Sequence, residues 1–167
     1  MSDLLLSEDE MLLKSTVRDF ADRVLAPRAA AYDESGAFPW DNVRGLAELG
    51  LCGLTVDEDY GGSGGTARLL AVAVEEIARG CGATSVIYIA HLALCTQLIA
   101  TFGSEDQKRD WLPRMVTGEV ITAIAMTEPG TGSDLQAVKT SAVADGNHLV
   151  VNGQKTFITN GQNADLI

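Results

Sequence analysis

The chain has 167 residues and carries 12 Lys and Arg against 23 Asp and Glu, which gives a formal net charge of −11. This balance argues against nucleic-acid binding, because a phosphate backbone is bound by clustered basic side chains and no basic run is longer than Lys108-Arg109. Hydrophobic residues make up 46% and charged residues 21%, as in folded domains rather than disordered chains. The length allows one ordinary domain, or one small domain and part of another.

The cysteines and histidines form no recognisable disulfide or metal pattern. Cys52, Cys81 and Cys95 are odd in number and widely spaced, which suits neither a disulfide framework nor a CxxC knuckle. His91 and His148 are the only imidazoles, so a zinc site would need an unusual geometry. We therefore expect no metal site and interpret the cysteines as core residues.

The sequence shows no targeting segment. The start at Met1 lacks the basic residues and the small-residue cleavage site of a secretory signal, and no Arg-rich transit segment is visible, so we expect a cytoplasmic protein. The apolar stretch Val86–Ala100 is interrupted by His91, Thr96 and Gln97 before it reaches the roughly 18 to 20 apolar residues of a membrane span. It is interpreted as a buried helix, and no membrane contact is expected.

The first 50 residues predict two helices. Ser7 and Glu10 form a capping-box pattern, apolar residues follow at helical spacing, and Pro27 is expected to end this helix. Pro39 stands where the first turn of a second helix tolerates it, and Gly50 is placed as its C-terminal stop.

The next 70 residues predict a loop and three further helices. The glycines of Asp57–Gly65 make a continuous helix or strand too costly, so this stretch is a loop. Pro113 conflicts with the last helix and should kink or shorten it. The expected helices are Ala67–Arg79, the central apolar helix Ala83–Phe102, and a helix from the capping box Ser104–Gln107 to Gly118.

From Val120 the periodicity becomes that of strands. The turn pairs Asp145-Gly146 and Asn152-Gly153 predict an antiparallel meander. The fold class is therefore α+β, with a helical domain at 1–119 and a partial β domain at 120–167 that we interpret as truncated. The expected strands are Ile121–Met126, Leu149–Val151, Thr156–Thr159 and one that begins at Ala164.

Met126–Asp134 is the stretch that most resembles a ligand loop. Pro129 fixes one φ angle, Gly130 and Gly132 remove side chains, and hydroxyl and backbone N–H groups supply donors for a flat polar ring or an anion. The third glycine of a dinucleotide fingerprint and the Gly-Lys-Ser/Thr of a Walker loop are both missing. From the residues alone, an ordinary Gly/Pro loop between two β segments remains equally open.

Several blocks in order resemble the acyl-CoA dehydrogenase family. They are Ala125–Asp134, Lys139-Thr140 and Asn152–Gly161, and the loop Asp59–Gly62 after an all-helical start is similar as well. Long matching blocks in order are far more specific than a single glycine pattern. The resemblance implies a helical N-terminal domain, a middle β domain, a C-terminal helical domain absent here, and FAD bound in a homotetramer.

The resemblance also implies roles for single residues. Thr127 would lie near the polar edge of the flavin ring, Phe157 would pack against that ring, and Thr159 would hydrogen-bond near N5. Many relatives have tryptophan where this chain has Phe157, a swap that keeps the apolar ring but loses an indole N–H. Ser133 is similar to the family serine that contacts the acyl-CoA substrate. The expected FAD contacts are Ile124, Met126, Thr127, Gly132, Ser133, Phe157, Ile158 and Thr159.

The implied activity is FAD-dependent α,β-dehydrogenation of acyl-CoA thioesters to trans-2-enoyl-CoA, with an electron-transfer flavoprotein as acceptor. The catalytic base of relatives is a glutamate of the C-terminal domain, so no catalytic residue is assigned and the fragment alone is expected to be inactive. An acyl-CoA oxidase, a nitroalkane-oxidising flavoenzyme and a non-catalytic, flavin-free module remain the alternatives.

His91, the pair Glu75-Glu76 and Tyr60 could each be functional, but we interpret them as structural residues. His91 is read as a satisfied polar group in an apolar helix, ahead of a liner of the acyl pocket. Glu75-Glu76 is read as a solvated helix face, because catalytic carboxylates need an enclosed site. Tyr60 is read as a ring that buries itself to close its loop.

Overall fold

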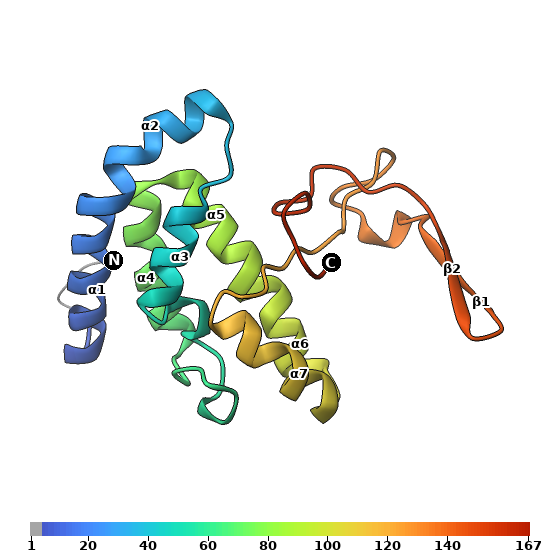
Figure 1. The fold of residues 1–167 in the computed structure, drawn as a ribbon, viewed down its shortest axis with the longest axis horizontal. Helices are drawn as coiled ribbons and strands as arrows, with labels where there is room; N and C mark the ends of the chain where they lie inside the picture. The colour runs from blue at the N-terminus through green and yellow to red at the C-terminus, as the bar shows by residue number, and fades with distance from the viewer. Residues whose placement is uncertain (1–4) are drawn as a thin grey trace.

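The computed structural model describes residues 5–167; Met1–Leu4, at the start of the chain where a signal segment was sought, lies outside the described residues. Figure 1 shows the helices gathered into one body, from which the last third of the chain runs out past α5 to a hairpin at the far end. The helices are α1 (Glu8–Phe20), α2 (Ala26–Ser35), α3 (Trp40–Glu48), α4 (Ala67–Gly80), α5 (Gly82–Ile89), α6 (Gln97–Phe102) and α7 (Glu105–Val116); the strands are β1 (Ser141–Asp145) and β2 (His148–Asn152).

Both capping boxes are confirmed. At α1 the Ser7 hydroxyl accepts from the Glu10 N–H and the Glu10 carboxylate accepts from the Ser7 N–H. Ser104 and Gln107 make the same exchange at α7. These contacts satisfy N–H groups that a helix start otherwise leaves unpaired.

The prediction that Pro27 ends the first helix is wrong. A π-helical segment, Ala21–Leu25, joins α1 to α2, and Pro27 stands in the first turn of α2, directly after this segment, where the chain tolerates its missing N–H. The helix ends instead at Ser35, where Gly36 takes a φ of 65°.

Pro113 does not shorten α7 either. The helix continues for three residues beyond it, to Val116. Leu112 and Met115 on either side of Pro113 are fully buried, and this burial outweighs one lost backbone hydrogen bond.

The core lies where α1 and α4 pack against each other and against the long helix that follows. A Cβ atom at Gly80 of α4 would lie 2.9 Å from the Cβ of Ala21, so the two helices approach closely there. Cys52, Cys81 and Cys95 are buried and free, as expected. The largest fully buried side chains include Val17, Leu25, Leu46, Val56, Val72, Ile77, Leu92, Leu112, Met115 and Ile121.

A single continuous helix, Gly82–Phe102, is formed by α5, a π-helical segment Ala90–Thr96 and α6. Among the described residues it is the one helix long and apolar enough to cross a membrane, judged by length and composition alone. Leu92 is fully buried in the core, whereas Leu98 and Phe102 are 42% and 79% exposed. The helix therefore has a face in the core and a second apolar face outside it.

The glycine-rich loop Asp57–Gly65 folds back on the residues before it. The Gly64 N–H donates to the Val56 carbonyl at 2.8 Å, and a Cβ at Gly62 would lie 2.1 Å from that same oxygen. The half-buried Tyr60 packs against the core and donates its hydroxyl to Glu105 Oε2 at 3.0 Å. The loop is thereby tied to α7.

Only one hairpin of the predicted meander forms. β1 pairs antiparallel with β2 across a two-residue turn at Gly146, whose φ is 60°. Every residue of both strands is exposed. The α+β class is confirmed, with a smaller sheet than expected.

The other predicted strands are wrong. Ile121–Met126 and the last residues share one isolated parallel bridge, between Thr122 and Leu166. Thr156–Thr159 is not a strand, because Phe157 has a φ of 55°, which breaks an extended run. At Gly153 the chain runs against Thr140 rather than turning into a new strand; a Cβ there would lie 2.2 Å from the Thr140 hydroxyl.

Candidate functional site

The structure brings together two segments that are about 30 residues apart in sequence, beside α5. Both contribute to one open depression of about 170 Å³. Six of the eight predicted cofactor-binding residues line it: Ile124, Met126, Thr127, Phe157, Ile158 and Thr159; the helical wall is Val86, Ile89, Ala90 and Leu94.

An apolar groove continues from this depression along α6. It has a volume of about 260 Å³ and shares Leu94, Ile124 and Met126 with the first depression. Leu98 and Phe102 add apolar surface at its far side. The two hollows share one wall. The hydroxyl groups of Thr127 and Thr159 lie at its first end, and its second end is apolar apart from Gln97 and Thr101.

Gly132 and Ser133 lie elsewhere. Both are exposed and neither lines the depression. They directly follow a tight turn in which Glu128 and Thr131 exchange backbone hydrogen bonds of 2.9 and 3.1 Å. The structure therefore places these two predicted contacts on a surface loop that follows the first segment.

Direct hydrogen bonds join the two segments. The Thr156 N–H donates to the Thr127 carbonyl at 3.0 Å. The Lys155 ammonium donates to the Met126 carbonyl at 3.1 Å and to Glu128 Oε1 at 3.0 Å. The position of the second segment is thus tied to the first by a side chain that the motif analysis did not single out.

Glu128 is a buried carboxylate that closes the loop carrying Gly132 and Ser133. It is 7% exposed and accepts from the N–H groups of Lys139, at 2.8 Å, and Thr140, at 2.9 Å. The bonds from Thr140, then from Lys139, together with the Lys155 ammonium, lower the pKa of Glu128 from 4.5 to about 2. The sequence indicates Glu128 only as part of the family motif, because its partners are 11 to 27 residues away.

This low pKa makes a prediction about acid stability. A carboxylate whose pKa is lowered by folding stabilises the protein above its unfolded pKa, near 4.5, and this contribution disappears as the pH falls toward 2. We expect the difference in free energy of unfolding between the wild type and Glu128→Gln to be largest at neutral pH and to shrink between about pH 4.5 and 2. Urea denaturation at several pH values measures it. An exposed control, Glu48→Gln, should change the free energy of unfolding by about 0.5 kcal/mol or less. A Glu128→Gln difference that stays the same at every pH would contradict the prediction.

His91 is a satisfied polar group, as expected. It is 2% exposed; its Nε2 donates to the Met115 carbonyl at 3.0 Å, and its Nδ1 lies 3.1 Å from the Thr122 hydroxyl. Burial lowers its pKa, which keeps the ring neutral. His91 has no place in the lining of either hollow described above.

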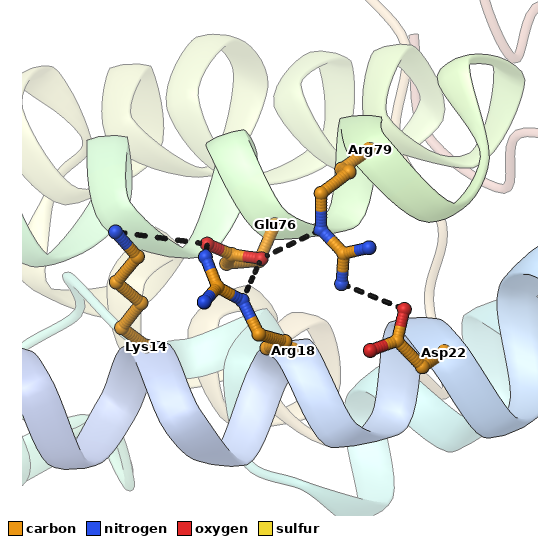
Figure 2. A network of polar contacts seen from close by, with 5 residues as sticks. All are labelled: Lys14, Arg18, Asp22, Glu76 and Arg79. Atoms are coloured by element: carbon orange, nitrogen blue, oxygen red, sulfur yellow. Dashed lines mark hydrogen bonds and ion pairs between the residues drawn. The ribbon is translucent and has the colours of Figure 1, made fainter.

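Of the pair Glu75-Glu76, only the first matches the prediction. Glu75 is exposed, but Glu76 is 1% exposed; it binds Arg18 of α1 across the helix interface and Arg79 on its own helix, α4. Figure 2 shows this network, which Lys14 and Asp22 extend. The network lies on the outer helices and not at the depression. Across residues 5–167 no group of three or more His, Cys, Asp or Glu residues could hold a metal ion.

Family profiles and individual relatives point to the same protein family. The family profile of the acyl-CoA dehydrogenase N-terminal domain matches residues 7–119, and that of the middle domain matches residues 123–167. A short-chain specific acyl-CoA dehydrogenase from Clostridium acetobutylicum is 42% identical over 98% of this chain and 43% of its own length. The chain belongs to the acyl-CoA dehydrogenase family.

Solved structures agree with this assignment. An acyl-CoA dehydrogenase from Geobacillus kaustophilus superposes with a TM-score of 0.91 at 40% identity, over 98% of this chain and 43% of that one. Glutaryl-CoA dehydrogenase from Mycobacterium smegmatis in complex with FADH2 superposes with a TM-score of 0.93 at 34% identity, over 98% and 42%. The chain thus spans about 43% of the length of the relatives that it matches.

Proposed function

We propose that the complete protein is an FAD-dependent acyl-CoA dehydrogenase, to which this chain contributes the N-terminal helices and part of the flavin site. The observation that carries the proposal is the meeting of six predicted cofactor contacts in one depression beside α5. Of the three relatives compared above, one is described with FADH2, and the other two are named acyl-CoA dehydrogenases.

The residues of the depression fit a flavin ring. Phe157 holds an aromatic ring that is 93% exposed, and Met126 adds a further exposed apolar surface. Thr127 and Thr159 supply hydroxyls at the same wall. At about 170 Å³ the depression is smaller than the roughly 300–1,000 Å³ of typical ligand pockets, so we propose that further parts of the complete protein enclose the cofactor.

FAD supplies a two-electron acceptor for the hydride that leaves the β-carbon of the acyl group. The residues of this chain bind and orient the flavin ring and the acyl chain. Phe157 and Ile158 offer apolar contact to the ring, the hydroxyls of Thr127 and Thr159 hydrogen-bond at its polar edge, and the apolar groove along α6 takes the acyl chain and keeps water from it. Ser133 contacts the carrier portion of the thioester. No residue of this chain is assigned as the base that removes the α-proton.

Anaerobic titration of the complete protein with acyl-CoA thioesters of different chain lengths tests this function. We expect the flavin absorption band to bleach with at least one substrate and to recover when an electron-transfer flavoprotein is added. A flavin that bleaches with no acyl-CoA would refute the dehydrogenase. Rapid oxygen consumption would identify an oxidase instead, and a stable protein without flavin would identify a non-catalytic module. Sedimentation of the same sample tests the proposed tetramer.

A further inference from the structure

Phe157 has the most constrained backbone of the candidate site. Its φ of 55° lies in the left-handed region, which bulky residues rarely adopt, and its ring remains 93% exposed. A residue stays in such a conformation only where the surrounding structure holds it there. The segment Thr156–Thr159 would otherwise relax to extended backbone, which its β-branched and aromatic residues favour. Each end of this segment must therefore be fixed.

Lys155 fixes the first end. Its side chain is half-buried and joins the Met126 carbonyl and the Glu128 carboxylate, at 3.1 and 3.0 Å. The Thr156 N–H bonds to the Thr127 carbonyl immediately beside it. Since Glu128 is itself held by two backbone N–H groups, the ammonium is anchored to a rigid acceptor.

Asn160 fixes the second end. It is 7% exposed, and its amide nitrogen donates to the Thr122 carbonyl at 3.0 Å and to the Ile87 carbonyl of α5 at 3.2 Å. Its own φ is 66°, a value that Asn tolerates better than most residues. Two backbone turns, from Gly161 to the Ile158 carbonyl and from Asn163 to the Asn160 carbonyl, close the chain around it.

We propose that Lys155 and Asn160 are positioning residues of the flavin site, which hold the two ends of Thr156–Thr159 so that Phe157 and Thr159 face the cofactor. The inference rests on the proposed function. Lys155 ties the segment to the loop Met126–Glu128, and Asn160 ties it to the helical body through Ile87. Neither side chain lines the depression; each acts through the backbone that it holds.

Two variants remove the ties with little other change. Lys155→Met keeps the aliphatic stem and deletes the ammonium. Asn160→Gly keeps access to positive φ and deletes the amide. Their matched controls are Lys108→Met, a half-buried and ion-paired lysine of α7, and Asn147→Gly, in the exposed hairpin turn.

Hydrogen exchange and FAD titration of the complete protein test the proposal together. In the FAD-free protein, each variant should exchange faster at residues 156–161, whereas the helices and the hairpin keep the wild-type rates. Each should weaken FAD binding, measured by quenching of flavin fluorescence, by about tenfold or more. Residues that hold metal ligands in place affect metal binding on this scale. The melting temperature and both controls should remain close to the wild type.

The results that would refute the positioning role differ from those that would refute the proposed function. A wild-type protein that binds no FAD refutes the proposed function and this inference with it. If the wild type binds FAD and the variants keep its FAD affinity or its hydrogen-exchange rate at residues 156–161, the positioning role alone is refuted. Faster exchange throughout the variant protein would show a general structural role and would also refute it.

Discussion

Replacing Glu76 by alanine is expected to lower the free energy of unfolding by about 3 kcal/mol, because it breaks a buried charge network. The Glu76 carboxylate is 1% exposed and lies 2.7 Å from Arg18 Nη2 and 3.0 Å from Arg79 Nε (Figure 2). Lys14, only 9% exposed, has its ammonium 4.0 Å away. Loss of the carboxylate leaves three cations gathered at one point of the α1–α4 interface.

The estimate is at the lower end of the range for broken buried pairs because both guanidinium groups reach solvent. The side chains of Arg18 and Arg79 are 48% and 44% exposed, so water replaces part of what they lose. Urea denaturation followed by circular dichroism measures the change. Glu34→Ala, at an exposed position of α2, should cost about 0.5 kcal/mol or less. Equal losses in the two variants would show that the network adds no stability.

Leu92→Ala is expected to cost about 3 kcal/mol, because Leu92 is fully buried at the centre of the long apolar helix and its truncation leaves a cavity. The matched control is Leu98→Ala on the same helix, where the side chain is 42% exposed and the cost should be about 1 kcal/mol or less. Denaturation in urea, in the absence of detergent, compares the two. Similar small losses at both positions would contradict a core position for Leu92.

The helical half of the fold was predictable because its signals are local. Ser7 and Ser104 bond to groups three residues away, and Gly50 stands just beyond a helix end with a φ angle of 73°. Such contacts depend on the immediate sequence alone. Pro27 and Pro113 were misjudged for the opposite reason, since the position of a π-helical segment and the burial of neighbouring side chains decided their effect.

The sequence predicted most of the residues that line the candidate site, but it did not predict the contacts that hold them in place. The motif blocks indicated Thr127 and Phe157, and the structure brings both to one depression. The roles of Glu128, Lys155 and Asn160 were not visible, because a carboxylate, an ammonium and an amide in a loop motif read equally well as solvated groups.

What the sequence determined by itself is the composition class, the capped helices, the hairpin turn at Gly146 and the family. What only the tertiary structure decided is the burial of Glu76, the left-handed backbone of Phe157 and the ties that hold it. The bond from Arg18 to Glu76 spans 58 residues, and that from Asn160 to Ile87 spans 73. A residue's local pattern carries no record of such partners, because they meet only when the hydrophobic core has brought distant segments together.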